Sequence, residues 1–340
     1  METSAPILIT GATGFVGFHT ARTLCARGRP VRALVRDRER GERLLGPIGV
    51  ATDALIEGDM TDIESVRRAM EGCAGVVHAA ASVSVTEGDA DFSENIRGTE
   101  TVIGTACERG LYGIFVSSLT AIFDPTREIT DDAPLVVSRT RYGLSKAECD
   151  GWVRERQGEG ARVAIVYPPG VVGPDDPGFS ESLKAYRSFL RGTLQSSGGN
   201  QMLDVRDLAD LFARMIEDET TERIVAAGHY FDWDGFTALL EGVTGTKIAR
   251  IRAPGWVLRG VARVMDVAGS VLKRPMPLTF EGVEIATRFP RMIDSAAIER
   301  LGLSWRPPEE TIEDLFRWYL ESGKLPAKAV PRLAAASESE

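Results

Sequence analysis

The chain has 340 residues, 43% of them apolar and 26% charged, as in a globular protein that forms two domains or one large domain with an added lobe. Its 40 basic and 49 acidic residues give a net charge of -9, so we expect no nucleic-acid partner and no attraction of the chain as a whole to an anionic membrane, while local basic sites stay open. Four widely spaced cysteines without a CxxC pair, and three histidines, predict neither a disulfide framework nor a metal site. Reduced thiols and an amino terminus without an export signal predict a cytoplasmic protein.

Short apolar runs alternate with helical patterns through the first half of the chain. This alternation predicts an α/β fold of the Rossmann type, with a doubly wound parallel sheet. The predicted strands cover residues 6–10, 31–35, 54–57, 76–80, 114–117 and 163–167. The helix after the third strand has the pattern of a capping box, formed by Thr61 and Glu64.

A glycine-rich loop joins the first strand to the first helix. It reads Thr10-Gly11-Ala12-Thr13-Gly14-Phe15-Val16-Gly17. Glycines at this place allow a tight turn and let backbone N–H groups approach a pyrophosphate at the positive end of a helix. A strand, this loop and a helix in succession therefore predict a dinucleotide site.

The Gly-x-x-Gly-x-x-Gly spacing and several later motifs resemble the extended short-chain dehydrogenase/reductases. That superfamily includes nucleotide-sugar epimerases, dihydroflavonol reductases and 3β-hydroxysteroid dehydrogenases. The matching segments are Gly58-Asp59, His78-Ala79-Ala80-Ala81, Asn95, Ser117-Ser118, Tyr142-Gly143-Leu144-Ser145-Lys146 and Tyr167-Pro168-Pro169-Gly170. The resemblance runs from Ile7 to about Asp207 and implies a nicotinamide cofactor.

The end of the second strand predicts which cofactor is preferred. An NAD site has a carboxylate there, whereas this chain has Val35 followed by Arg36, whose guanidinium can pair with a 2′-phosphate. Arg36 also resembles the NADP-binding arginine of the dihydroflavonol reductases, so we expect NADP(H), with NAD(H) as the second choice. Two alternatives stay open: Arg36, Arg38, Arg40 and Arg43 form a solvated helix face, or Asp37 acts as a displaced NAD carboxylate.

The remaining cofactor contacts come from the resemblance. It implies that Asp59 accepts from the adenine amino group, although Asp59 equally suits a turn cap. His78 is expected to pack behind the strand. The full predicted cofactor set is Thr10, Gly11, Thr13, Gly14, Phe15, Val16, Gly17, Arg36, Asp59, Met60, Ala79, Ala80, Ala81, Tyr142, Lys146 and Pro168.

Tyr142 and Lys146 lie four residues apart in a helical pattern, so both project from one face. An ammonium beside the phenol would lower its pKa from near 10 toward the working range. Ser118 would donate a hydrogen bond to a substrate oxygen, and Thr120 is a second candidate for substrate contact. Asn95 resembles an asparagine that the family associates with its catalytic centre. The alternatives are a surface pair at residues 142 and 146 and a local backbone bond for Asn95.

The second half of the chain loses the regular rhythm. We expect a dinucleotide-binding domain over residues 1–173, with a later strand returning to it, a smaller and mostly helical substrate lobe over residues 174–325, and a disordered tail over residues 326–340. Predicted helices cover residues 208–217, 233–243 and 311–321, and short strands lie near 224–227 and 247–251. Residues 253–272 predict an amphipathic helix that closes the substrate site, with membrane-surface contact as the minor alternative.

Two departures argue against a sugar-nucleotide substrate. Ile122-Phe123-Asp124 replaces the Val-Tyr-Gly of those enzymes, and no arginine precedes Val205-Arg206-Asp207. Apolar residues of the lobe, if they do not simply form its core, would suit a hydrophobic carbonyl compound; these are Phe179, Tyr186, Phe189, Trp256, Val257, Met265 and Met276. We therefore predict an NADP(H)-dependent oxidoreductase acting on a carbonyl or secondary alcohol of a small hydrophobic molecule. The alternatives are an NAD-dependent nucleotide-sugar epimerase or dehydratase and a non-catalytic nucleotide sensor, and a homodimer is left open.

Overall fold

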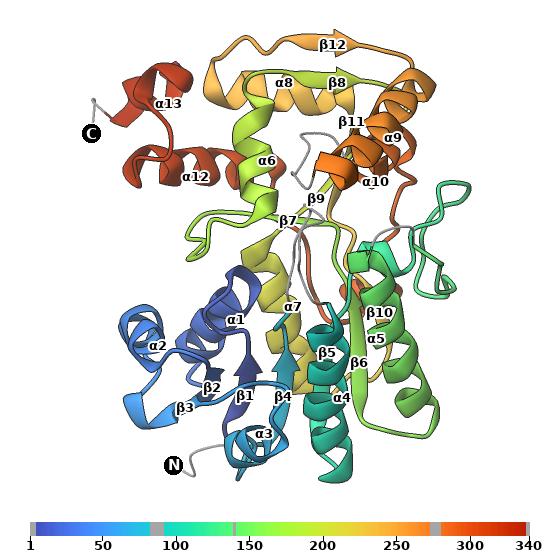
Figure 1. Cartoon of the computed structure of the whole chain (residues 1–340). Helices are drawn as coiled ribbons and strands as arrows, with labels where there is room; N and C mark the ends of the chain where they lie inside the picture. The colour runs from blue at the N-terminus through green and yellow to red at the C-terminus, as the bar shows by residue number, and fades with distance from the viewer. Residues whose placement is uncertain (1–4, 82–91, 139–140, 273–279, 338–340) are drawn as a thin grey trace.

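A computed structural model of the chain describes residues 5–81, 92–138, 141–272 and 280–337. Two lobes lie one above the other (Figure 1). The lower lobe contains a seven-stranded parallel sheet in the order β10-β6-β5-β4-β1-β2-β3. Its strands are β1 (Ile7–Thr10), β2 (Val31–Val35), β3 (Leu55–Glu57), β4 (Gly75–His78), β5 (Tyr112–Val116), β6 (Val163–Tyr167) and β10 (Arg223–Val225). The α/β fold and its predicted strands are confirmed.

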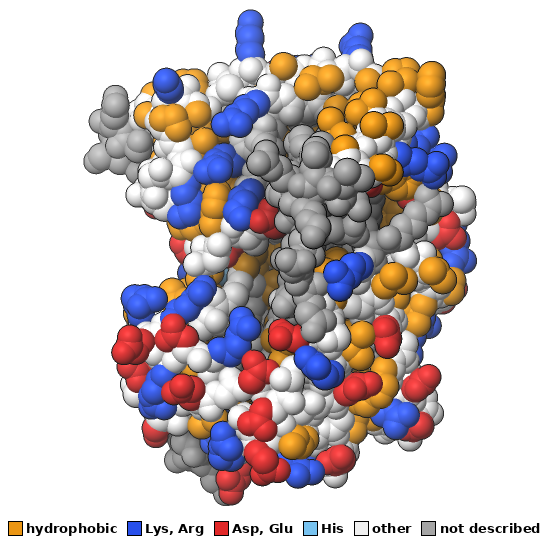
Figure 2. Space-filling view, in the orientation of Figure 1, with side chains coloured by type: hydrophobic (Ala, Val, Ile, Leu, Met, Phe, Trp, Pro, Cys, Tyr) orange, Lys and Arg blue, Asp and Glu red, His pale blue; other side chains and the backbone are white. Residues whose placement is uncertain are grey.

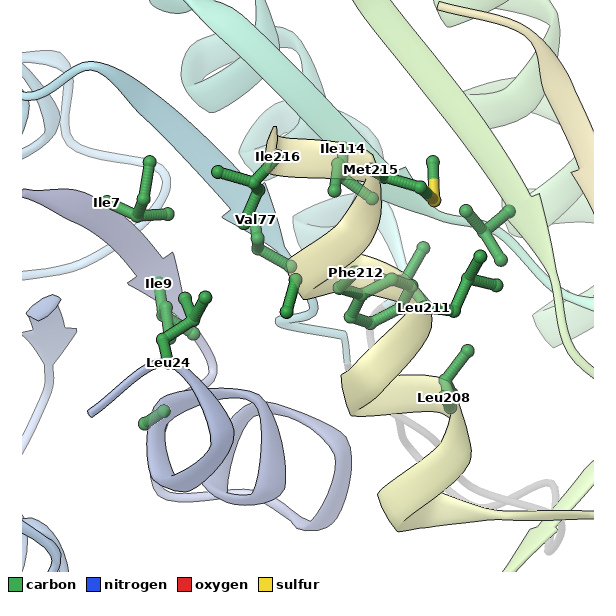
Figure 3. Packing of buried hydrophobic residues seen from close by; sticks show 14 of the residues in the cluster. Ile7, Ile9, Leu24, Val77, Ile114, Leu208, Leu211, Phe212, Met215 and Ile216 are labelled. Carbon is green, nitrogen blue, oxygen red and sulfur yellow. The ribbon is translucent and has the colours of Figure 1, made fainter. Parts of the chain in front are cut away.

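The strands of this sheet are apolar because helices cover both faces. Ile7 and Ile9 point to one face and pack with α1 (Phe15–Ala26) and α7 (Val205–Asp218), as Figure 3 shows. Leu8, between them in the strand, points to the other face and joins a core shared with α3 (Ile63–Ala69), α4 (Ser93–Glu108) and α5 (Arg141–Gly158). Each such side chain contributes about 1.5–3 kcal/mol when fully buried.

The direction of the strand order reverses between β1 and β4. From β1 the chain runs outward through β2 and β3, then crosses to β4 on the other side of β1. Crossovers therefore leave the carboxyl ends of β1 and β4 in opposite directions and separate there. Open α/β sheets bind their ligands at such a reversal, outside the carboxyl ends of the strands.

The helix after β3 begins later than the sequence predicts. It is α3 (Ile63–Ala69), and its cap is Asp62, whose carboxylate accepts from the backbone N–H groups of Glu64 and Ser65. Thr61 instead donates to Asp59. The predicted capping box of Thr61 with Glu64 is thus wrong, because the carboxylate one residue further on reaches the free N–H groups of the first turn.

The lower lobe also takes elements from beyond residue 173. Strand β10 pairs with β6, as expected for a returning strand. Helix α7 packs along α1, and Ala297 and Ile298 of α11 (Ala296–Arg300) enter the same core. The predicted substrate lobe of residues 174–325 is therefore not one continuous stretch, since the chain crosses between the lobes more than once.

Two small sheets and several helices form the upper lobe (Figure 1). One sheet has the order β11-β9-β7 and the other pairs β12 with β8. Phe236 lies at the centre of the lobe's core. The strands are β7 (Gly170–Val172), β8 (Thr193–Gln195), β9 (Gly199–Asp204), β11 (His229–Asp232) and β12 (Arg250–Arg252), and the helices are α6 (Glu181–Phe189), α8 (Trp233–Thr244), α9 (Gly255–Leu272), α10 (Phe280–Arg288) and α12 (Pro308–Glu321). Shorter elements elsewhere are α2 (Arg38–Leu45), η1 (Gly46–Ile48), η2 (Thr52–Ala54) and η3 (Leu119–Ala121).

The predicted disordered tail is wrong for most of its length. Residues 327–337 form η4 (Ala327–Ala329) and α13 (Pro331–Ser337). Val330 and Leu333 are buried in the core of the upper lobe, and α13 packs against α8 and α12. Two apolar anchors, three residues apart, are enough to hold a short helix against a larger apolar surface, and composition does not reveal them. Residues 338–340 lie outside the described part of the chain.

The orientation of α9 also differs from the prediction. The helix is present, but Trp256, Val261 and Val264 on it are exposed rather than turned toward a substrate site. The inward contact is made by Ala262, which is fully buried. Within the described residues, no helix has the length and apolar character that a bilayer crossing demands.

Candidate active site

The glycine-rich loop packs directly on the end of β4. Gly11 has a φ of 73°, and a Cβ there would lie 2.8 Å from the backbone of Ala80. A Cβ on Gly17 would lie 2.2 Å from the carbonyl oxygen of Gly11. A side chain at Gly11 or at Gly17 would therefore clash with neighbouring backbone. The two glycines let the loop pack closely against the end of β4 and against the first turn of α1.

The amino-terminal turn of α1 is open to an anion. Gly14, the residue before the helix, is exposed and extended, and no side chain caps the turn. The first turn carries no acidic residue. Its free N–H groups and the positive end of the helix dipole therefore fit a pyrophosphate, beside half-buried Thr13, Phe15 and Val16.

Thr10, at the start of the loop, is hydrogen-bonded to His78 at the end of β4. The Thr10 hydroxyl and His78 Nδ1 are 2.7 Å apart, and His78 Nε2 lies 3.2 Å from the Thr99 hydroxyl. Burial, together with nearby Lys146, lowers the pKa of His78 to about 3. The ring is therefore neutral at physiological pH, and the prediction that it packs behind the strand is confirmed.

Arg36 is exposed at the end of β2 and forms no salt bridge with any residue in the described ranges. The carboxylate of Asp37 caps α2 by accepting from the N–H of Arg40, and Arg38 donates to the carbonyl oxygens of Leu55 and Thr52. These neighbours are engaged in structure. The contact of Arg36 with a 2′-phosphate, and with it the preference for NADP(H), stays a prediction.

Asp59 and Met60 have structural partners. Asp59 accepts from the N–H and the hydroxyl of Thr61. Burial would raise the pKa of Asp59, but the Thr61 hydrogen bonds and nearby Arg36 outweigh it and lower that pKa. The Met60 side chain packs against Gly98 on α4. Asp59 thus performs the turn-capping role that the sequence left open, and its predicted adenine contact stays a prediction.

Ser118 keeps its hydroxyl proton available. It follows β5 and is half-buried, and its Oγ accepts from the Thr120 N–H at 3.2 Å and from the Thr120 hydroxyl at 3.0 Å. A serine hydroxyl has one proton to donate in addition to its two acceptor positions. No acceptor within the described residues takes that proton, and the predicted hydrogen bond from Ser118 to a substrate oxygen stays a prediction. Thr120 orients the Ser118 side chain through these two hydrogen bonds.

Tyr142 and Lys146 lie one turn apart on α5. Tyr142 is half-buried beside Phe92, whose ring centroid is 5.8 Å from its own. Lys146 is only 5% exposed, and its Nζ donates to the Val116 carbonyl at 3.2 Å. Burial lowers the pKa of Lys146, which nearby Cys149 and Asp150 partly offset. The predicted stabilisation of the Tyr142 phenolate by Lys146 stays a prediction.

Asn95 is buried on α4 and donates to the hydroxyl of Ser145 at 3.4 Å. Ser145 in turn donates to the carbonyl of Tyr142 at 2.8 Å. The pair therefore links α4 to the first turn of α5, beneath Tyr142. Asn95 acts on this structure through Ser145, a residue that the sequence argument did not single out.

A buried charge network missed by the sequence argument lies one turn beyond Lys146. Asp150 is fully buried and accepts from the Ser117 hydroxyl at 2.5 Å, from Arg154 at 2.6 Å and from the Tyr167 hydroxyl at 3.1 Å. Burial raises the pKa of Asp150 despite these partners. The Ser117 hydroxyl is thus buried and hydrogen-bonded. The network ties the end of β5, which presents Ser118, to α5, which presents Tyr142.

The predicted residues meet at one edge of the sheet. Gly11 follows β1, Ala79 follows β4, Ser118 follows β5 and buried Pro168 follows β6. Because all four strands are parallel and adjacent, their carboxyl ends lie side by side. Ala80 and Ala81 continue from Ala79 and are half-buried.

A hollow of about 440 Å³ lies elsewhere, between α6 and the segment after α12. None of the predicted site residues lines it.

The strand order, the glycine loop and the side chains at the strand ends define a dinucleotide-binding protein of the Rossmann type. The chain belongs to the NAD-dependent epimerase/dehydratase family, the extended short-chain dehydrogenase/reductases, whose sequence profile matches residues 7–228. The resemblance noted from the motifs is confirmed, and an NAD(P) cofactor is typical of this family.

Named relatives align over nearly the whole chain. A Synechocystis protein provisionally named dihydroflavonol 4-reductase is 27% identical over 332 residues, 93% of this chain and 94% of that protein. Sterol demethylase protein B of Methylococcus capsulatus is 27% identical over 332 residues, 94% of this chain and 99% of that protein. Cinnamoyl-CoA reductase 2 of Medicago truncatula is 24% identical over 340 residues, 94% and 93% of the two chains.

Solved structures agree on the fold. The crystal structure of gox2253 superimposes with a TM-score of 0.78 at 24% identity, covering 95% of this chain and 100% of that one. UDP-glucose 4-epimerase from Bifidobacterium longum, in complex with NAD+ and UDP, gives a TM-score of 0.70 at 18% identity, covering 94% and 99%. At these identities the likeness establishes the architecture alone.

Proposed function

We propose that this chain is an NADP(H)-dependent oxidoreductase that interconverts a carbonyl and a secondary alcohol on a small hydrophobic molecule. The observation that carries the proposal is the arrangement at the end of β5. There Ser118 has an unused hydroxyl proton within the described residues, and Tyr142 and Lys146 lie on the adjoining helix α5. The glycine loop, which fits a pyrophosphate, follows β1 at the same edge of the sheet.

Each residue has a separate task. Ser118 donates to the substrate oxygen and stabilises the negative charge that develops there. Tyr142 gives a proton to that oxygen, or takes one from it, and Lys146 favours the phenolate and binds the nicotinamide ribose. When bound, the nicotinamide supplies or accepts the hydride at the substrate carbon. Asn95 and Asp150 position Tyr142 and Ser118 through the contacts described above.

The preference for NADP(H) rests on Arg36. Its guanidinium is exposed at the end of β2, where the 2′ position of the adenine ribose is expected, and it is not held by a carboxylate of the described chain. Asp37 already caps α2, which makes it a weaker candidate for binding ribose hydroxyls in an NAD site. Arginine suits a phosphate because its N–H groups form a rigid fork.

The preference for a hydrophobic substrate rests on the region after η3. Phe123, which lies in the segment that departs from the sugar-nucleotide pattern, has its ring centroid 6.3 Å from that of Phe289, and Tyr230 of β11 lies 6.4 Å from Phe289. Phe289 is buried, and Phe123 and Tyr230 pack against the same apolar cluster, so the segment after η3 joins an apolar contact that reaches β11. Arg206 is bound by Asp204 and Asp314, so it is not available for a sugar diphosphate.

The apolar residues proposed from sequence as a substrate lining do not support this preference. Phe179, Tyr186 and Phe189 pack in the core of the upper lobe against Phe236 and its neighbours, and Trp256 is exposed. Tyr186 and Phe189 lie three residues apart on α6, a spacing that serves packing. Val257 and Met265 are half-buried on α9, and Met276 lies outside the described residues.

The names of the relatives support a reductase. They include a dihydroflavonol 4-reductase and cinnamoyl-CoA reductases, whose names specify reduction of small organic molecules. The second candidate, an epimerase that retains NAD through its cycle, is favoured by the structural likeness to UDP-glucose 4-epimerase. That likeness, at 18% identity, reflects the fold.

A panel of hydrophobic ketones and aldehydes, run with NADPH and NADH side by side on the purified full chain, tests the proposal. We expect consumption of NADPH matched by an equal amount of alcohol, and slower turnover with NADH. Conversion of UDP-glucose without net change in a copurifying cofactor would establish the epimerase instead. Tight NADPH binding with no turnover of any carbonyl compound would favour the nucleotide sensor.

A further inference from the structure

Helix α9 presents a continuous apolar face to solvent. Trp256 is 72% exposed, Val264 is 70% exposed and Val267 is 66% exposed. These positions are eight and three residues apart, so their side chains lie along one stripe of the helix. Figure 2 shows hydrophobic side chains gathered over the upper right of the molecule, where α9 and β12 lie in Figure 1.

The patch continues beyond the helix and contains most of the large exposed apolar side chains in the described residues. Val261 on α9 is 43% exposed, and Ile251 on β12, which leads into α9, is 53% exposed. The opposite face of α9 holds the helix in place through Ala262, which packs at 0% exposure near α10. The exposed stripe is therefore not a face that the fold itself buries.

Arginines surround this patch. Arg252 and Arg263 are exposed, and neither forms a salt bridge with a carboxylate of the described chain. Arg263 lies over the Phe280 ring at 4.8 Å, and Arg259 donates to the Thr287 hydroxyl. The one carboxylate on α9, Asp266, accepts from the backbone N–H of Phe280. A local basic and apolar surface thus lies on a chain whose net charge is -9.

We propose that this α9 patch, formed by Ile251, Trp256, Val261, Val264 and Val267 with Arg252 and Arg263, docks on an anionic lipid surface. A tryptophan and valines enter the boundary between headgroups and acyl chains, while guanidinium groups remain at the level of the lipid phosphates. The combination of an apolar stripe and flanking arginines matches that boundary in both polarity and charge.

A second copy of the chain fits the patch less well. A two-fold interface brings the same surface of each copy together, so two patches flanked by arginines and of the same sign of charge would face each other. Like charges at close range oppose such a contact. The charge of the patch therefore favours an anionic partner over self-association.

Sedimentation of the full chain with vesicles tests this docking. Vesicles of phosphatidylcholine alone are compared with vesicles that also contain phosphatidylglycerol, at low and high salt. We expect binding to the anionic vesicles that weakens as salt is added. The double variant Trp256→Ser/Val264→Ser should bind at least about tenfold more weakly, and Arg252→Glu/Arg263→Glu should lose the dependence on phosphatidylglycerol.

Ile63→Ser, which removes an apolar side chain 38% exposed on the lower lobe, is the matched control and should bind as the unmodified chain does. All of these side chains are exposed, so thermal unfolding should be nearly unchanged. Turnover of a water-soluble carbonyl compound should also be unchanged in the α9 variants, which keeps this test separate from that of the proposed function. The proposal is overturned if anionic vesicles do not bind the chain at low salt, if the serine variants bind equally well, or if light scattering reveals a dimer that Trp256→Ser disrupts.

Discussion

The two lobes of this molecule differ in the side chains that characterise their interiors. The lower lobe takes charged and polar side chains into its interior and satisfies them there, as with His78, Lys146 and Asp150. The upper lobe buries aromatic side chains around Phe236 and leaves apolar side chains such as Trp256 in solvent. Buried polar groups are costly unless they are bonded, so their presence marks the lobe in which position matters most.

This difference indicates where each lobe tolerates change. In the lower lobe, glycine contacts and buried hydrogen bonds fix the ends of four adjacent strands. In the upper lobe, short strands and helices pack around an apolar core, with much of α9 at the surface. We therefore expect substitutions at the sheet edge to change chemistry or folding steeply, and comparable substitutions in the upper lobe to have small effects.

The largest effect is expected from Tyr142→Phe. If the phenol transfers the proton, its loss lowers kcat by about 10²–10⁴, while the affinity for NADPH stays nearly unchanged. Single-turnover reduction of an accepted carbonyl compound, together with cofactor titration, measures both quantities. Tyr186→Phe is the matched control in the upper lobe, where the hydroxyl accepts from Asn200 and lies in the core.

An undiminished kcat in Tyr142→Phe would contradict the assignment of the phenol. Lys146→Ala is expected to differ from it by lowering kcat and weakening cofactor binding together, because the lysine is assigned to both the phenolate and the ribose.

The second largest effect is expected from low pH, which should destabilise the lower lobe. Burial, aided by Arg22, lowers the pKa of His19 to about 4, and burial and Lys146 lower that of His78 to about 3, from the usual 6.5. Below pH 6.5 the two histidines are therefore protonated in the unfolded chain but still neutral in the folded chain. The free energy of unfolding falls as the pH falls from 6.5 toward the two lowered pKa values. Each histidine contributes a loss of about 2 kcal/mol between about pH 7.5 and 5.

Urea unfolding at several pH values measures this loss. His78→Asn removes one of the two titrating rings, so the slope of stability against pH below 6.5 should fall by about half. An identical slope in the variant and the unmodified chain would mean that other groups cause the acid sensitivity.

A smaller effect is expected for Arg36→Ala. Loss of one charge-assisted contact to the 2′-phosphate is worth about 1.5–3 kcal/mol, so NADPH should bind roughly 10-fold to 100-fold more weakly while NADH binding is unchanged. Arg40→Ala serves as a neighbouring control. Equal affinity of the unmodified chain for the two cofactors would remove the basis of this prediction.

The smallest effects come from a matched pair of helical glycines. In α1, Gly17→Ala would place a Cβ 2.2 Å from the Gly11 carbonyl, and we expect it to destabilise the fold by about 1–3 kcal/mol and to weaken cofactor binding. In α8, exposed Gly242 has nothing within 4 Å of its added Cβ, so Gly242→Ala should stabilise by about 0.5–1 kcal/mol. Thermal unfolding of both variants measures the two changes in stability, which we expect to have opposite signs. A change of the same sign in both variants would contradict the comparison.

Much of the lower lobe was predictable because its signals are local. Apolar runs between helical patterns predict buried parallel strands, and the spacing of Gly11, Gly14 and Gly17 predicts a phosphate loop between a strand and a helix. The four-residue spacing of Tyr142 and Lys146 places them on one helical face. Parallel strands then bring Ser118 to the same edge, so the candidate site follows from order along the chain.

Tertiary contacts decided the rest. Asp150 is a partner of Ser117 only because α5 packs against the end of β5, and α7 joins the lower lobe only because the chain returns to it. Val330 is anchored by a surface built from α8 and α12. The direction of the apolar stripe of α9 was likewise open, since periodicity defines a face of a helix but not what covers it. Burial depends on which distant elements meet, and a local pattern does not contain that information.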